Sequence, residues 1–407
     1  DGAFKINHLF YVDDLKIYAA TDADLNKALN GVQSVSAAVG LKLNPSKCAK
    51  VLTSGELETD NYSGVARSIP SLAASETYKY LGIEQHIHQN WNEVMNRVKA
   101  EVKRKTLAIW NSDLTFAQKV LLHNSAVIAK LRYVYLNYLL GDGKLESEIK
   151  QAQDLDVEIR SWLVMAKARY DKSRVCRLYI PKKEGGYGLR SAVMELKMSK
   201  VYAWSYVLMQ PDFSHLRKMC HTQDRRDKRT LRGDVTKILA EYGLKIEDVE
   251  GTAIRVIRTD NGTETTILEG PIDARQLARS MTSVMTESYR KGLHVQWKQK
   301  GVSSRVAMNQ SIDQRATWLW LEKGHLNSVA VRNVFACQEW CLLTRAHKSN
   351  VNGPRTCRYK CWQGKPTETQ FALETPQHIT TGCSKWRPTL MYYRHDQIAR
   401  VLHYNYC

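Results

Sequence analysis

The stretch HLFYVDDLKIYA, residues 8–19, places two adjacent carboxylates, Asp13 and Asp14, between two apolar runs that are rich in β-forming residues. Strand-like runs on both sides of a short polar tip predict a β-hairpin. Each carboxylate makes the other costlier to ionise, because like charges at close range repel. The pattern leaves two interpretations: a divalent-metal site, or an exposed Asp-Asp turn.

A metal site would explain why the two acids are adjacent. Mg²⁺ prefers hard oxygen ligands, and its charge cancels the repulsion between the carboxylates. In two-metal sites such carboxylates hold ions about 4 Å apart, where they assist the in-line transfer of a phosphoryl group. Because neighbouring strand residues point to opposite faces, we expect Asp13 to be the metal ligand and Asp14 to be an outer ligand.

The composition favours a polyanionic partner. The 407 residues include 60 Lys and Arg against 41 Asp and Glu, a formal net charge of +19. This excess points to nucleic acid. The sequence has neither an apolar run long enough for a membrane span nor an apparent secretory leader, so we expect an intracellular protein, in the nucleus and cytoplasm, without a membrane partner. Nine cysteines in so long a chain indicate reduced thiols or a metal site.

The chain changes character along its length, and the predicted fold class is α+β. Residues 1–89 mix strands with one amphipathic helix that follows Thr21 as its N-cap. Residues 90–215 carry helical periodicity, interrupted by the loop RLYIPKKEGGYGLRS (177–191). Residues 216–345 are expected to be a helical linker with a small hairpin at TDNGTETT, and residues 346–407 a small metal-binding module. The charge run QDRRDKRTLRGD (223–234) is expected to be a solvated linker.

Several segments resemble the reverse transcriptases, in that family's order. The tetrapeptide Tyr-Val-Asp-Asp between apolar strands resembles the catalytic hairpin. GLKLNPSKCAKVL (40–52) resembles the helix-to-strand segment that follows it, and YKYLGIEQ (78–85) resembles the primer-grip strand. The resemblance implies a partial polymerase palm at residues 1–89, an antiparallel hairpin plus a helix, followed by a mainly α-helical thumb and linker.

The resemblance also assigns roles to residues. Asp13 and Asp14 would hold Mg²⁺ in a two-metal site, and Lys47 would lie near the incoming dNTP. Tyr11 and Val12 would lie near the primer end, and Tyr80, Leu81 and Gly82 would form the primer grip. For Lys47 the alternative is a solvated turn, and for the strand at Tyr80 it is core packing.

More specifically, the chain resembles the site-specific non-LTR retrotransposons whose polyprotein couples a reverse transcriptase to a restriction-like endonuclease. RLYIPKKEGGYGL (177–189) and the C-terminal segments TCRYKC, PQHITTGC and YYRHDQIARVLHYNYC carry this resemblance. It implies DNA synthesis on an RNA template, primed by nicked target DNA. The chain begins at Asp1, so we expect a fragment, inactive alone because the family's metal site takes another aspartate from a preceding strand.

Four residues near the C-terminus have the donor atoms of a zinc site. Cys357, Cys361, His378 and Cys383 form the pattern C-x3-C-x16-H-x4-C, and three thiolates with one imidazole suit tetrahedral Zn²⁺. The gaps are wider than those of the family's knuckle, and unconnected reduced cysteines are the alternative. Cys337 and Cys341 are expected to share one face of a helix and to be packed in the core, with substitute metal ligation as the alternative.

The basic excess is concentrated in residues 160–229, which hold 17 Lys or Arg against 6 Asp or Glu. Within it, Lys182, Lys183 and Arg190 are expected to contact the phosphate backbone, with the loop glycines allowing a close approach. Tyr187 would stack on a base or pack. The tryptophans at 318, 320 and 340 have helical spacing, which favours core burial.

Three other functions remain open. A decayed or domesticated copy would keep only its affinity for nucleic acid. A group II intron-type maturase shares the Asp-Asp hairpin but fits the C-terminal cysteines and histidine poorly. A zinc-dependent structural adaptor would leave residues 8–85 unexplained. The oligomeric state is not predicted.

Overall fold

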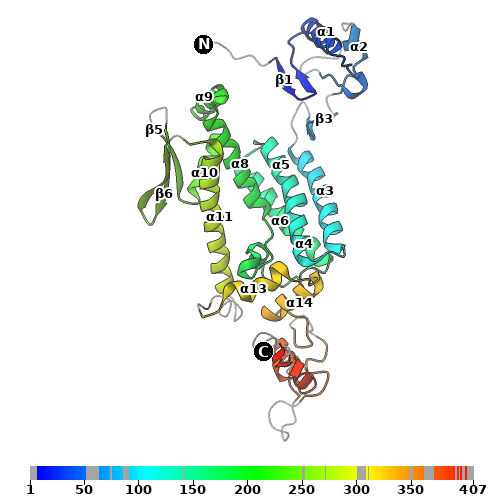
Figure 1. Ribbon diagram of the computed structural model, residues 1–407, viewed down its shortest axis with the longest axis vertical. Helices are drawn as coiled ribbons and strands as arrows, with labels where there is room; N and C mark the ends of the chain where they lie inside the picture. Colours follow the sequence, from blue (N-terminus) through cyan, green and yellow to red (C-terminus); the bar gives the residue numbers. More distant parts are fainter. Residues whose placement is uncertain are drawn as a thin grey trace. The chain divides into compact units, whose positions relative to one another are not determined.

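The computed structural model describes residues 7–51, 64–73, 76–85, 91–140, 143–249, 253–270, 272–299, 309, 311–347, 352–361, 371–389, 392–393, 395–396 and 399–400. Helices predominate among them, with small antiparallel sheets, so the predicted α+β class is confirmed. Figure 1 shows the elements in chain order, from β1 in blue to the C-terminal region in red. None of the described helices is both long and apolar enough to cross a membrane.

The strands of the described residues pair in three small sheets. They are β1 (His8–Tyr11), β2 (Asp14–Ile17), β3 (Tyr78–Tyr80), β4 (Ile83–Gln85), β5 (Leu244–Val249), β6 (Ala253–Asp260) and β7 (Thr263–Gly270). β1 pairs with β2, β3 pairs with β4, and β5, β6 and β7 follow one another as a meander; every pairing is antiparallel.

The main helices carry most of the buried residues. They are α1 (Asp22–Ala38), α2 (Gly64–Ser68), α3 (Trp91–Asn111), α4 (Phe116–Leu122), α5 (Ala129–Asn137), α6 (Leu145–Met165), α7 (Cys176–Tyr179), α8 (Ala192–Met209), α9 (Ser214–Asp224), α10 (Leu231–Ala240), α11 (Ala274–Lys298), α13 (Gln314–Lys323) and α14 (Ser328–Gln338). Shorter turns of helix lie at Pro45–Lys47, His123–Ile128, Lys182–Glu184, Pro211–Phe213 and His378–Gly382.

The contacts divide the chain into two compact units that do not follow chain order. One comprises residues 1–101, 131–152 and 195–282, and the other comprises 102–130, 153–194 and 283–407. The division into four consecutive domains therefore remains a prediction.

Residues 7–85 have a small core of their own. Leu29 of α1 packs with Ala66 and Ile69, and partly buried side chains such as Ile17 cover this cluster. Thr21 caps α1 by accepting a hydrogen bond from the Asp24 amide at 3.1 Å, as the sequence predicts. Every residue of β1 is exposed. The hairpin therefore contacts this core through β2 rather than through β1.

The region 216–345, expected to be a helical linker, contains the β5–β6–β7 sheet. The predicted hairpin at TDNGTETT is confirmed: Asn261 and Gly262 have φ of 50° and 83°, the pair of left-handed conformations that a type I′ turn requires. β5 was not predicted as a strand. Its residues 244–249, LKIEDV, contain three charges in six positions, which hides the strand pattern.

The C-terminal end of α14 differs from the prediction for the cysteines. Trp340 is left-handed, with φ of 58°, and the Cys341 amide donates to the Ala336 carbonyl at 3.0 Å, so the helix ends at Gln338. Cys337 and Cys341 therefore do not share a helix face. Cys341 is buried and Cys337 is partly buried. Trp318 is buried as expected, whereas Trp340 is 47% exposed.

Candidate active site and metal centre

The Asp-Asp pair lies at the tip of the β1–β2 hairpin. Tyr11 pairs with Asp14 across the strands, so Val12 and Asp13 form the two-residue turn and Asp14 is the first residue of β2. Both carboxylates are exposed, as are the side chains of Tyr11 and Val12. The local geometry therefore presents Asp13 and Asp14 to solvent at one place.

Val12 adopts a conformation that β-branched residues avoid. Its φ is 56°, in the left-handed region where glycine is the usual residue. Such a conformation costs about 1–3 kcal/mol and persists where the surroundings impose it, often at functional sites. The strained residue directly precedes Asp13, so the turn fixes the direction in which the Asp13 side chain projects from the backbone.

Two carboxylates alone are few ligands for a divalent ion. Among the described residues, the Cys/His group near the C-terminus brings three or more metal-type side chains together with close donor atoms, and Asp13 and Asp14 belong to no such group. A hard divalent cation takes about six oxygen ligands, with water supplying those that protein or substrate does not. Asp13 and Asp14 therefore suit a site that a further ligand completes.

The β3–β4 hairpin lies against β2, although about 65 residues separate them in sequence. Lys16 of β2 donates to the Gln85 side chain at 2.5 Å, and its ammonium lies 5.9 Å from the centre of the Tyr80 ring. Burial raises the pKa of Tyr80, and the negative charge of Asp14 raises it further. The structure thus brings the predicted primer-grip strand to the Asp-Asp hairpin.

Lys47 belongs to the same group of segments. It ends the short helical turn Pro45–Lys47, and its carbonyl accepts a hydrogen bond from the Tyr78 hydroxyl at 2.6 Å. The Lys47 side chain is exposed. Its backbone is therefore fixed to β3, while its ammonium is open to solvent.

The Leu81–Gly82 turn is held by residues that the sequence did not indicate. Tyr133 of α5 donates its hydroxyl proton to the Leu81 carbonyl, and Tyr138 donates to the Glu84 carbonyl. Arg97 of α3 pairs with the Glu84 carboxylate. A hairpin of two three-residue strands is unstable alone, so these contacts fix it to the helices. Their only sequence signal is a Tyr-rich segment, which equally fits a core.

The loop after α7 does not present its glycine amides to a ligand. The Gly185, Gly186 and Gly188 amides donate to the carbonyls of Lys182, Pro181 and Ile180. A side chain at Gly185 would come within 2.7 Å of Trp318, and one at Gly186 within 2.1 Å of the Ile180 carbonyl oxygen. The expected close approach to phosphate is therefore wrong, because these glycines permit close packing within the protein.

The remaining loop residues divide between surface and interior. Lys183 and Arg190 are exposed and Lys182 is partly exposed, so they stay candidates for phosphate contact. Tyr187 is 2% exposed, packs edge-on against Phe116 and Phe335, and donates to the Ala168 carbonyl at 2.9 Å. Of the two interpretations of Tyr187, the structure shows packing.

The four predicted zinc ligands lie together. One donor atom from each of Cys357, Cys361, His378 and Cys383 falls within 4.8 Å of the others, and the three cysteines are buried. The Cys361 sulfur is 3.6 Å from those of Cys357 and Cys383. That separation exceeds a disulfide bond and is close to the roughly 3.8 Å between thiolates around tetrahedral zinc with Zn–S bonds of about 2.3 Å.

Local backbone structure explains how distant residues converge on this centre. The Cys357 amide donates to the Ala372 carbonyl at 2.8 Å, and the Ala372 amide donates to the Cys361 carbonyl at 2.7 Å. Lys360, with φ of 52°, closes the turn between the first two cysteines. His378 begins the helical turn that ends at Gly382, directly before Cys383.

The electrostatics also suit a metal. Burial raises the pKa of Cys361, but hydrogen bonds from Ser384, His378 and Cys357 outweigh this effect and lower it to about 6, so a thiolate forms near neutral pH. Within the described residues, the buried Nε2 atom of His378 has no hydrogen-bond partner. A buried ring nitrogen without a partner is available to a metal ion, so the donor set fits zinc.

Comparison with known proteins concerns the N-terminal part of the chain. A search of curated proteins gave no significant match. Residues 1–85, which include the Asp-Asp hairpin, Lys47 and the β3–β4 hairpin, match the family model described as reverse transcriptase (RNA-dependent DNA polymerase). This segment therefore resembles a reverse transcriptase-type polymerase, a family that copies nucleic-acid templates from dNTPs with divalent metal.

Proposed function

We propose that this chain is part of the RNA-directed DNA polymerase of a non-LTR retrotransposon. Its reaction would be target-primed reverse transcription, in which the 3′-hydroxyl of nicked DNA is extended on an RNA template. The match of residues 1–85 supports the polymerase. The non-LTR lineage rests on the resemblance of the loop at 177–189 and of the C-terminal segments. Action on chromosomal DNA would place the protein in the nucleus.

The observation that carries the proposal is the meeting of three segments. The carboxylate tip at Asp13, the turn at Lys47 and the hairpin containing Tyr80 are joined by the Lys16–Gln85 and Tyr78–Lys47 hydrogen bonds. Nucleotide transfer needs metal ligands, a cation for the triphosphate and a support for the primer end in one place. These segments contain one residue type for each need.

The roles follow from the residue chemistry. Bound Mg²⁺ would activate the primer hydroxyl and stabilise the leaving pyrophosphate. Asp13 would hold the metal and Asp14 would add negative charge beside it. Lys47 would bind the triphosphate, while Tyr11, Val12 and the Tyr80–Gly82 turn would orient the primer. A further carboxylate is needed, and we expect it from a strand that precedes the hairpin in the family's metal site.

Primer extension tests the proposal. The polypeptide encoded by the whole reading frame around these residues would be incubated with an RNA template annealed to a DNA primer, dNTPs and Mg²⁺. We expect extension that requires both the RNA and the metal, and we expect residues 1–407 alone to bind without extending. Binding without extension by the complete polypeptide would favour the decayed copy that keeps only its affinity for nucleic acid. Stimulation of intron splicing by the protein would favour the maturase.

A further inference from the structure

The turn between α9 and α10 carries a group of exposed basic side chains. Arg225, Arg226 and Lys228 are all exposed, and in the described part of the chain none of the three contacts a carboxylate. Lys218 and His221 of α9 are exposed as well. His221 lies three residues after Lys218 and four residues before Arg225, so the three side chains share one helix face. We define these five residues as the α9 basic surface.

Five of the other basic residues in 160–229 are not available to a ligand. Of the 17 Lys and Arg residues in 160–229, Arg169, Arg177, Lys197 and Lys200 are buried, and Arg229 is paired with two carboxylates. The exposed ones are Lys167, Lys172, Lys183, Arg190, Lys218, Arg225, Arg226 and Lys228. Half of the exposed positive charge in this stretch therefore lies within residues 218–228.

This segment is a defined turn between two helices rather than a linker, although its residues 225–228 are exposed to solvent as expected. Asp227 is left-handed, with φ of 52°, and the Lys228 amide donates to the Gln223 carbonyl at 3.0 Å, which closes α9. Asp224 accepts from Thr230, the N-cap of α10, and pairs with Arg232 at 2.8 Å. The end of one helix and the start of the next are thus joined directly.

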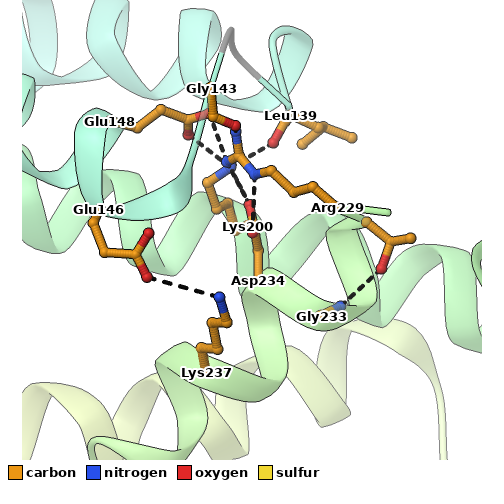
Figure 2. A network of polar contacts seen from close by, with 10 residues as sticks. Leu139, Gly143, Glu146, Glu148, Lys200, Arg229, Gly233, Asp234 and Lys237 are labelled. Atoms are coloured by element: carbon orange, nitrogen blue, oxygen red, sulfur yellow. Dashed lines mark hydrogen bonds and ion pairs between the residues drawn. The ribbon is translucent and has the colours of Figure 1, made fainter. Parts of the chain in front are cut away.

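A buried charge network holds the other side of the turn. Arg229 donates to Glu148 and Asp234, both at 2.7 Å, and to the Gly143 carbonyl at 3.0 Å. Lys200, which is fully buried, pairs with the same two carboxylates at 2.8 and 3.1 Å. Figure 2 shows Arg229 and Lys200 converging on Glu148 and Asp234. Arg229 therefore points inward, and the residues just before it face solvent.

We propose that the α9 basic surface binds the phosphodiester backbone of the nucleic acid on which the polymerase acts. Unpaired cations on a preordered turn lose little conformational entropy on binding, and phosphate neutralisation releases counterions. The inference rests on the proposed function for the identity of its partner, but binding requires neither Asp13 nor Mg²⁺. It adds a contact outside the residues assigned from the sequence, and it carries no base specificity.

Binding would be measured by fluorescence anisotropy with the full 407-residue chain, in EDTA and without dNTPs. The probes are labelled single-stranded RNA, duplex DNA and an RNA–DNA hybrid, each at several salt concentrations. We expect the triple variant R225A/R226A/K228A to bind at least one probe about tenfold more weakly, and to lower the slope of log K against log salt by about 2–3.

The matched control is the triple variant K237A/K245A/R255A. It removes the same three charges, but those side chains face Glu146, Glu247 and Glu269. We expect its affinity to stay within about threefold of wild type, because only long-range attraction is lost. Equal weakening by both triple variants, or wild-type affinity and slope in the first, would overturn the inference.

Two controls distinguish an effect on binding from an effect on folding and from failure of the polymerase proposal. Cations at a helix C-terminus also stabilise the helix, so each variant is melted first. If the triple variant melts more than about 5 °C below wild type, the single reversal Arg226→Glu replaces it under the same criteria. Binding is measured in EDTA and without dNTPs, so failure of the polymerase proposal would leave this test intact.

Discussion

At the residue scale, Val12 and Leu81 occupy equivalent places, the first position of a two-residue hairpin turn, and both have positive φ. Gly82, which follows Leu81, also has positive φ, a conformation that glycine accepts without strain, and its turn lies against Tyr133. Nothing in the sequence marks Val12, since valine gives no local signal for a left-handed backbone. Strain of this kind is visible only in the structure.

The strain at Val12 predicts that a substitution there lowers primer-extension activity while it leaves the free energy of unfolding almost unchanged. Val12→Gly removes about 1–2 kcal/mol of strain and adds a similar entropic cost, so the free energy of unfolding should change by less than about 1 kcal/mol. The more mobile turn would orient Asp13 less well, so primer extension should fall about tenfold or more. Urea unfolding and primer extension by the same variant check both; unchanged extension would contradict the positioning role.

The four residues of the Cys/His cluster could be predicted individually as candidate zinc ligands because cysteine and histidine are rare and their chemistry is specific. We expect one equivalent of zinc per chain, measured by elemental analysis after dialysis. Cys383→Ala should lose it, because three remaining donors bind zinc far more weakly. Cys337→Ala is the matched control, since Cys337 lies outside the cluster. Full zinc content in the Cys383 variant would refute the site.

Glu374, which the sequence did not indicate, fixes the loop beside these ligands. It is buried and accepts hydrogen bonds from the Arg358 side chain and amide and from the Arg345 amide. Hydrogen bonds from Arg358 lower its pKa from the ordinary 4.5 to about 2, against the opposing effect of burial. Since the folded pKa lies below the unfolded one, its stabilisation is present above pH 4.5 and is lost as the pH falls from 4.5 towards 2.

In zinc-free protein, this loss should therefore appear in the difference in the free energy of unfolding between wild type and Glu374→Gln. Glu374→Gln should cost about 1–2 kcal/mol at pH 7 and progressively less as the pH falls below 4.5. Taking the difference cancels the titration of the other groups. Unfolding curves at several pH values measure it; a cost that does not vary between pH 7 and pH 3 would exclude an ionised Glu374 as the cause.

At the scale of elements, features that depend on neighbouring residues could be predicted from the sequence, whereas features that depend on long-range contacts could not. The N-cap at Thr21 and the Asn261–Gly262 turn were predicted because each depends on residues within a few positions. The burial of Lys200 and Arg177 could not be predicted. Their partners, Glu148 and Glu339, lie 52 and 162 positions away, and charged residues usually indicate a surface.

The buried network makes a prediction about α6, α8 and α10, which supply Glu148, Lys200 and Asp234. Lys200→Met should lower the free energy of unfolding by about 3–5 kcal/mol, because two buried carboxylates would then lose one of the two cations that they share. Lys237→Met is the matched control. Its partner Glu146 is exposed, 3.7 Å away, and visible beside the network in Figure 2, so the cost should be below about 1 kcal/mol. Similar costs for both would contradict the network's role.

At the scale of the whole molecule, chain order predicted the order of the structural elements but not the grouping of residues. The hairpin, the helical region and the Cys/His cluster follow one another as expected. The two compact units each combine three separate segments, and such long-range contacts leave no periodic signal. The basic stretch 160–229 likewise divides into buried structural cations and an exposed surface, which composition alone does not distinguish.

The most direct test of the central claim is the rate of RNA-templated primer extension by Asp13→Asn in the complete polypeptide. Asparagine keeps the size of the side chain and removes the charge that holds the metal, so we predict a loss of about 10³-fold or more with primer–template affinity unchanged. Asp212→Asn, at an exposed position outside the hairpin, is the matched control and should extend at the wild-type rate. A wild-type rate for Asp13→Asn would contradict the assignment of this hairpin as the catalytic centre.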